Sequence, residues 1–71
     1  MECLTNVELL NEKIRESGKS PTVLAAEWGM SLPTYYSRKN GNSEFTASEI
    51  VAATESLGLT TAERDAIFLG G

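Results

Sequence analysis

The chain of 71 residues has no histidine, a single cysteine, and no apolar run near the about 20 residues that a membrane-spanning helix needs. Because Cys3 has no partner for an internal disulfide, the sequence fits a reducing compartment. No positively charged segment precedes an apolar one, so no signal peptide is predicted. We therefore expect a cytoplasmic protein that makes no membrane contact.

The same absences argue against catalysis. The sequence has no glycine-rich phosphate loop, no paired cysteines at metal-binding spacing, and no credible serine or cysteine triad. Glu12 and Glu16 lie four residues apart, but a solvent-facing acidic stripe explains them better than an acid/base pair. We predict that the protein is not an enzyme and needs no cofactor, no metal and no small-molecule substrate.

Basic residues are also few, and their distribution is uneven. The net charge is −4, which argues against general affinity for nucleic acid. Residues 18–43, however, carry Lys19, Arg38 and Lys39 against Glu27 alone, a local charge of +2. This asymmetry is what a weak, locally directed DNA-binding protein would show, while ordinary scatter of surface charge remains the alternative.

What the sequence does contain is a succession of helix signals without any strand signal. Polar capping residues and glycine stops delimit five helices, at about residues 6–17, 21–28, 32–40, 46–57 and 60–69. Capping boxes are predicted at Thr5–Glu8, Thr46–Glu49 and Thr60–Glu63. Apolar residues recur at helical spacing, as in Val7, Leu10 and Ile14 of the first helix. The sequence therefore predicts one all-α domain covering residues 1–71.

The most informative stretch is residues 20–41, which reads as two short helices joined by a tight turn. Ser20 and Ser31 are placed to cap the two helices, and Pro21 suits the first helical position. Gly29 permits the positive φ that ends the first helix.

The apolar residues of this stretch suit the same layout. Leu24 and Trp28 share one face, and Tyr35 faces back toward the core. Ala25 is small where the second helix must approach, and Met30 buries the turn. This is the layout of a DNA-binding helix-turn-helix, in which the second helix enters the major groove.

Over about residues 5–69 the chain resembles the Cro and phage-repressor helix-turn-helix superfamily, of the five-helix, lambda-repressor-like type, and small prophage regulators in particular. The resemblance is carried, in this order, by Leu24-Ala25, Gly29-Met30-Ser31, Thr34-Tyr35, Asn40-Gly41, Ser43-Glu44-Phe45, Ser48-Glu49-Ile50, Leu57-Gly58-Leu59 and the tail from Glu63 to Phe68.

The resemblance implies a set of DNA-contacting residues. Base-reading positions of the family fall on Leu32, Pro33 and Ser37, flanked by Thr34, Tyr36 and Arg38. Implied phosphate contacts come from the first of the two helices and from the end of the second with its loop: Ser20, Thr22, Lys39, Asn40, Asn42 and Ser43.

The sequence departs from the family pattern at the expected interface. Pro21 stands where relatives commonly have a glutamine that contacts DNA. Leu32 and Pro33 offer no hydrogen bonds to base edges and can only pack on thymine methyl groups. Arg38 is the best candidate for guanine, and Arg38 and Lys39 are both expected to be exposed. Tyr36 is expected to be exposed, either to contact a phosphate or a partner protein or without a role.

The C-terminal residues Ile67, Phe68 and Leu69 are three consecutive apolar side chains that either cap the core or form a dimer face. Successive side chains turn by about 100° around a helix, so at least one of the three is expected to face outward. We therefore predict a weak homodimer through this segment.

Two functions follow as hypotheses. The first is a transcriptional regulator, a repressor or Cro-like protein, that binds double-stranded DNA at an inverted-repeat operator as a homodimer. The alternative is a protein-interaction module that keeps the helix-turn-helix fold and acts as an antirepressor or modulator of a phage repressor. The acidic net charge and the Leu32-Pro33 pair favour the alternative.

Overall fold

The computed structural model describes residues 5–69, which form five helices and no strand. The helices are α1 (Val7–Ser17), α2 (Pro21–Glu27), α3 (Leu32–Lys39), α4 (Ala47–Leu57) and α5 (Thr61–Phe68). Each helix begins within one residue of its predicted start, because the capping residues that mark helix starts act locally. Cys3 lies outside the described residues.

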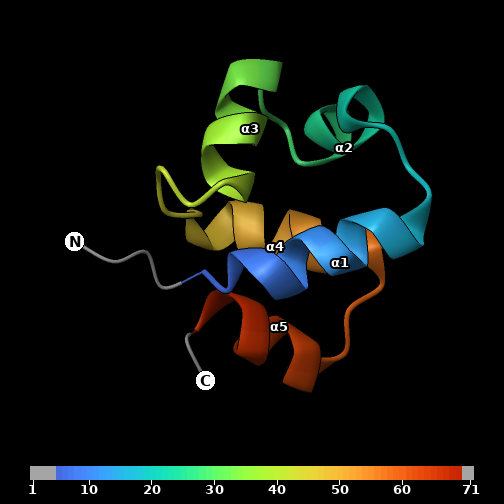
Figure 1. Cartoon of the computed structure of the whole chain (residues 1–71), viewed down its shortest axis with the longest axis vertical. Coiled ribbons are helices and arrows are strands. Elements are labelled where there is room, and N and C mark those ends of the chain that lie inside the picture. Colours follow the sequence, from blue (N-terminus) through green and yellow to red (C-terminus); the bar gives the residue numbers. More distant parts are fainter. Residues whose placement is uncertain (1–4, 70–71) are drawn as a thin grey trace.

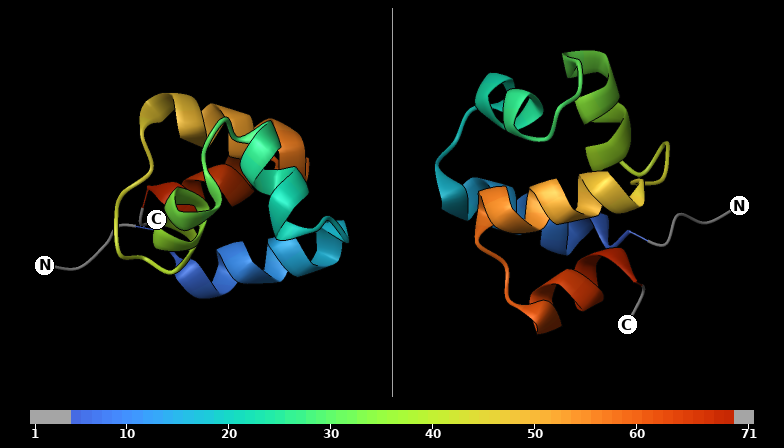
Figure 2. Two further views of the ribbon diagram at one scale, coloured as in Figure 1. Left: turned by 90° about the horizontal axis from the view of Figure 1, so that it is seen from above. Right: turned by 180° about the vertical axis from the view of Figure 1, so that it is seen from behind.

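The helices form a small body with α1 and α4 side by side in its middle (Figure 1). The α2–α3 pair lies on one side of these two helices, and α5 lies on the opposite side, as the view from behind also shows (Figure 2). α2 packs against both α3 and α4, while α5 packs against α1 and α4. The α2–α3 pair is therefore separated from α5 by the middle layer.

Two of the three predicted capping boxes are present. Thr46 accepts a hydrogen bond from the backbone N–H of Glu49, whose carboxylate accepts one from Thr46 N–H, and Thr60 and Glu63 make the same exchange. Such reciprocal bonds satisfy two backbone donors that the first helical turn leaves unpaired.

The prediction of a capping box at Thr5 is wrong. α1 is capped by Asn6, whose Oδ1 accepts a hydrogen bond from the backbone N–H of Leu9 at 3.1 Å. The backbone N–H of Asn6 donates instead to the carbonyl of Ile67 in α5, at 2.6 Å. Thr5 is buried by this contact between the start of α1 and the end of α5. A tertiary contact thus moved the helix start by one residue.

The core is built around four aromatic rings, two from helices α3 and α5, one from the turn after α2 and one from the loop before α4. Trp28 contacts Tyr35 and Phe45, with ring centroids 5.1 and 5.7 Å away, and Phe45 contacts Phe68 at 4.9 Å. Leu10, Leu24, Ala25, Ala53 and Ile67 complete the buried set. The predicted core positions of Leu24, Ala25, Trp28 and Tyr35 are confirmed.

The turn between α2 and α3 occupies residues 28–31. Gly29 has φ of +72°, which a residue with a Cβ adopts only with strain, and the N–H of Met30 donates to the carbonyl of Ala25 at 2.9 Å. This closes the end of α2 and directs the chain into α3, and Met30 packs partly buried against the core as predicted.

Candidate nucleic-acid interface

The start of α3 is held by a polar cap and presents two apolar side chains. Ser31 Oγ accepts a hydrogen bond from Thr34 N–H at 3.4 Å and donates one to Thr34 Oγ1 at 3.1 Å. Pro33 occupies the second helical position, where no backbone donor is needed. Pro33 is exposed, and Leu32 is 40% exposed. Both predicted base-reading positions at this end are therefore accessible.

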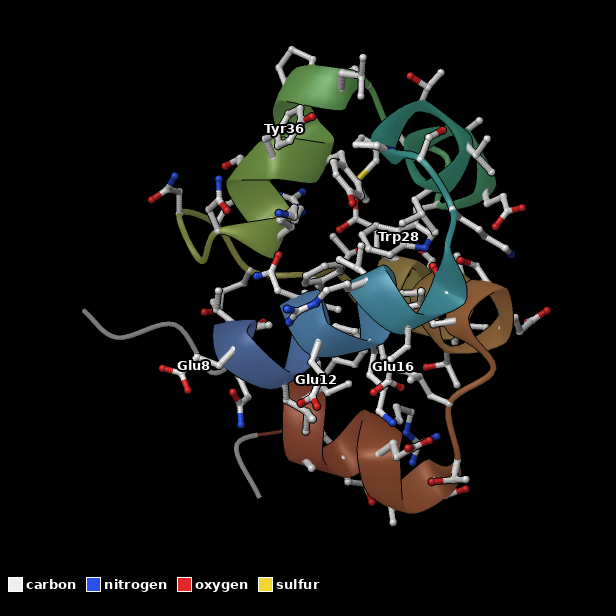
Figure 3. All side chains as sticks on the ribbon, turned by 45° about the vertical axis from the view of Figure 1, so that its right-hand side comes forward. Glu8, Glu12, Glu16, Trp28 and Tyr36 are labelled. Carbon is white, nitrogen blue, oxygen red and sulfur yellow. The ribbon has the colours of Figure 1, made fainter. Side chains whose placement is uncertain are left out.

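The two neighbouring tyrosines of α3 have opposite environments. Tyr35 is completely buried against Trp28, whereas Tyr36 is 43% exposed on the outer side of α3 (Figure 3). The hydroxyl of Tyr35 is buried and has no hydrogen-bond partner. Burial raises the pKa of Tyr35, and the nearby Tyr36 hydroxyl adds to the rise. The prediction that Tyr36 faces outward is confirmed.

Arg38 is not the exposed DNA-reading cation that the sequence predicts. Its guanidinium donates from Nε to Glu49 Oε1 at 2.8 Å and from Nη1 to Ser43 Oγ at 2.6 Å. The Arg38 and Glu49 side chains are only 20% and 17% exposed. Arg38 lies three residues after the buried Tyr35 and so shares the inner side of α3. The expectation that Arg38 is exposed is therefore wrong, because its charge connects α3 to the start of α4.

Glu49 has a double role that sequence reasoning missed. Its carboxylate accepts hydrogen bonds from Arg38 and from the backbone N–H of Thr46, at 2.9 Å. The Arg38 hydrogen bond, followed by the Thr46 backbone bond, lowers the pKa of Glu49 against the opposing effect of desolvation. Only the capping-box role had a sequence signal, since Arg38 lies eleven residues away across a loop.

Ser37 and Ser43 bond to each other, with their hydroxyl oxygens 2.8 Å apart. Ser37 was expected to read bases and Ser43 to contact phosphate, yet both are half-buried. Asn40 and Asn42, the other two residues predicted to contact phosphate here, have exposed side chains just beyond α3. The accessible amides therefore lie at the C-terminal end of α3.

Lys39 is the cation of α3 that remains without a carboxylate partner within residues 5–69. Its ammonium lies 6.0 Å from the centre of the Tyr36 ring, at the edge of the range of a cation–π contact. Lys39 is half-buried, so its expected full exposure is wrong, but Tyr36 and Lys39 together form a polar-tipped pair next to Leu32 and Pro33.

The start of α2 is accessible but not strongly basic. Ser20 and Thr22 are exposed, and Ser20 Oγ accepts the capping bond from Val23 N–H at 3.3 Å. Lys19 donates to Glu27 Oε1 and to the backbone carbonyl of Ser56, both at 2.9 Å. Lys19 and Arg38 thus have carboxylate partners, and Glu49, the partner of Arg38 from outside residues 18–43, halves the local charge of +2 read from the sequence.

Of the three C-terminal residues predicted to form a dimer face, two are buried in the core. Ile67 is fully buried and Phe68 is 4% exposed, with Phe68 packed against Phe45. Two adjacent positions about 100° apart both fit the broad inner side of α5, which packs on α1 and α4. The assignment of Ile67 and Phe68 to a dimer interface is therefore wrong. Leu69 is 59% exposed, as expected for at least one of the three.

A groove between α2 and α4 was not foreseen. It is lined by Lys19, Glu27, Ser48, Val51, Ala52, Glu55 and Ser56. Ser56, one of the lining residues, accepts a hydrogen bond at its Oγ from Trp28 Nε1 at 2.9 Å. Mixed small and charged residues line the groove, and no sequence motif marks such a surface.

The described residues contain no cluster of three or more metal-ligating side chains. Each helix in residues 5–69 is too short or too polar to cross a bilayer. Neither family models, curated proteins nor solved structures match this chain, so its function has to be inferred from its own residues.

Proposed function

We propose that the protein is a sequence-specific DNA-binding regulator of the helix-turn-helix type, with α2 as the supporting helix and α3 as the helix that enters the major groove. The observation that carries the proposal is the accessible side of α3. It presents Leu32, Pro33 and Tyr36, with Lys39 beside them, and α3 contains no acidic residue. A helix without acidic side chains at the end of the molecule can approach a phosphate backbone without direct repulsion.

Binding through this surface would depend on few phosphate contacts. Lys39 is the one α3 cation outside the intramolecular ion pairs of residues 5–69. Exposed Ser20, Thr22, Asn40 and Asn42 would add neutral contacts to phosphate oxygens. The expected affinity for DNA is therefore modest and its salt dependence shallow.

The proposed regulator acts as a weak homodimer on an inverted repeat, which places two α3 helices about 34–36 Å apart. Because Ile67 and Phe68 are buried, Leu69 is the C-terminal apolar side chain available for self-association. Sedimentation of the wild type and of Leu69→Asp at high concentration tests this contact. A wild type that stays monomeric would refute it.

Fluorescence anisotropy with a random-sequence duplex tests DNA binding, with salt varied from low to physiological. We expect weak binding at low salt, and Lys39→Ala should reduce the slope of log affinity against log salt by about 0.9, the value for one lost phosphate contact. Arg64→Ala is the matched control, because Arg64 lies on α5 and pairs with its neighbour Asp65. Absence of binding at low salt would overturn the proposal, and equal slopes for all three proteins would exclude Lys39 from the interface.

The second candidate, a modulator that binds a repressor protein, is favoured by a specific observation. Two of the three basic residues of the α2–α3 region are paired with carboxylates, while Val23, Leu32 and Tyr36 remain exposed there. An exposed apolar surface with little free charge is also typical of a protein–protein interface. Co-precipitation of a repressor from the same genome, together with no DNA binding, would support this function.

A further inference from the structure

The polar side chains of α3 are mostly engaged inside the molecule. Thr34 accepts a hydrogen bond from Ser31, Ser37 bonds to Ser43, and Arg38 binds Glu49 and Ser43. Direct reading of bases by hydrogen bonds needs side-chain donors or acceptors that are free to meet the base edges. To read DNA with Ser37 or Arg38, α3 would first have to give up bonds that hold it to the following loop and to α4. Thr34 keeps a free O–H donor but is only partly exposed.

The side chains that remain accessible at the front of α3 are apolar. Leu32 is 40% exposed, Pro33 is exposed beside it, and Tyr36 follows four residues after Leu32 on the same side of the helix. The exposed Tyr36 and the half-buried Lys39 lie toward the C-terminal half of α3, and neither side chain makes a hydrogen bond or ion pair within the described residues. The exposed surface at the start of α3 is therefore mainly apolar.

In the major groove, the C5 methyl of thymine is the apolar group that distinguishes one base from the others. On this basis, which rests on the proposed DNA binding, we infer that α3 selects its site through contacts of Leu32 and Pro33 with thymine methyl groups. Tyr36 and Lys39 anchor the helix to phosphates in this arrangement and contribute little sequence preference.

This mode of reading has a chemical consequence that hydrogen-bond reading lacks. A protein that reads the methyl group should accept 5-methylcytosine opposite guanine where it accepts thymine opposite adenine, since both bases carry a C5 methyl. It should discriminate against deoxyuridine, which keeps every hydrogen-bonding group of thymine and lacks only the methyl. C5 methylation of cytosine in a site would then strengthen binding.

The experiment begins by selecting tight binders from a random-sequence duplex library with the wild-type protein. Each thymine of the best duplex is then replaced singly by deoxyuridine, and each T·A pair singly by C·G or by 5-methylcytosine·G. Affinities are measured by anisotropy at constant salt. At a contacted thymine we expect deoxyuridine to weaken binding about fourfold, the equivalent of one buried methyl group. 5-Methylcytosine should bind more tightly than cytosine by a similar factor.

Leu32→Ala ties the effect to this side chain. In that variant the thymine and deoxyuridine duplexes should bind equally at one position at least, because the methyl group has lost its partner. Val51→Ala is the matched control, since Val51 is a 56% exposed aliphatic residue of α4, a helix whose backbone does not contact that of α3. Val51→Ala should keep the full discrimination between thymine and deoxyuridine.

The outcomes separate this inference from the proposed function. If the wild type binds duplex DNA but deoxyuridine is tolerated at every position, methyl reading is wrong while DNA binding stands. If discrimination survives Leu32→Ala at every position, the methyl contacts come from other residues and the assignment to Leu32 is wrong. If no duplex is bound at low salt, the proposed function itself fails.

Discussion

α1 and α3 are each held to a later helix by an ion pair, but their exposed sides differ in charge. In each case a basic residue of the helix binds the glutamate of a capping box on a later helix: Lys13 binds Glu63 at 2.6 Å, and Arg38 binds Glu49 at 2.8 Å. Figure 3 shows Glu8, Glu12 and Glu16 spaced along α1. All three are exposed, whereas the accessible side of α3 is apolar and free of acids.

This difference indicates which end of the molecule suits an anionic partner. Three exposed carboxylates on α1 would repel a phosphate backbone, whereas Glu63 and Asp65 of the nearby α5 are paired with Lys13 and Arg64. The α2–α3 region has one acid, Glu27, and its charge is balanced by Lys19. Under the proposed DNA binding, the distribution of charge over the surface matters more than the net charge of −4.

The largest effect is expected at the α5 end, from Phe68→Asp. Phe68 is 4% exposed, and losing a buried phenylalanine costs about 3–5 kcal/mol even without a charge. A buried, unpaired carboxylate adds to this cost. We expect circular dichroism to show that the variant is unfolded. Leu69→Asp, at the exposed neighbouring position, should change the free energy of unfolding by about 0.5 kcal/mol or less. A folded Phe68→Asp would contradict the core position of Phe68.

At the other end, Ala25→Leu should destabilise the contact between α2 and α3. Ala25 is 3% exposed, and extra methyl groups in a packed crossing cost about 1–3 kcal/mol. Urea unfolding measures the loss. The control is Ala26→Leu, because Ala26 is the exposed neighbour on the same helix and should change stability by about 0.5 kcal/mol or less. Equal behaviour of the two variants would mean that the crossing is misplaced.

Glu49 and Glu63, the glutamates of these two ion pairs, differ in how much their charge contributes to stability. The Arg38 hydrogen bond lowers the pKa of Glu49 below its ordinary value of 4.5, and the Lys13 hydrogen bond lowers that of Glu63. A lowered pKa in the folded state stabilises the protein above pH 4.5, and this stability is lost as the pH falls through the lower folded value.

Urea unfolding at neutral pH and below pH 4.5 should therefore show less acid sensitivity in Glu49→Gln than in wild type. At neutral pH we expect this variant to lose about 1 kcal/mol, since an amide keeps the capping bond but weakens the bond to Arg38. Glu63→Gln should lose less, because the Glu63 side chain is 32% exposed against 17% for Glu49. A larger loss of stability in Glu63→Gln than in Glu49→Gln would contradict this ranking of the two ion pairs.

The smallest effect is expected within α3. The Tyr35 hydroxyl is buried without a partner, so Tyr35→Phe should leave stability unchanged or raise it by about 1 kcal/mol or less. Tyr36→Phe, on the exposed side, should leave the melting temperature unchanged. A clear loss of stability in Tyr35→Phe would show that the hydroxyl has a bonding partner in solution.

Sequence reasoning found the helices and most of their caps because these depend on neighbours in the chain. Ser20, Ser31, Thr46 and Thr60 each bond to a backbone N–H three residues later, a distance that is visible in the sequence. The glycine stop at Gly58, with φ of +65°, is equally local.

The errors concern contacts between distant segments. Thr5 lost its capping role because the start of α1 bonds to Ile67. The sequence around Arg38 predicts an exposed side chain because Glu49, its partner, is eleven residues away. The sequence around Phe68 gives no sign of its partner Phe45, which lies in a distant loop. For the same reason the charge that α3 offers to DNA was overestimated.

The central claim is that the α2–α3 end binds DNA and the α1–α5 side does not. Titration of the 15N-labelled protein with a short duplex, at low salt, tests it residue by residue through amide chemical shifts. The account predicts that the shifts concentrate on residues of α3 and its flanks, among them Leu32, Tyr36 and Lys39, while Glu8, Glu12 and Glu16 stay unchanged. Shifts concentrated on α1 or α5, or no shifts at all, would contradict it.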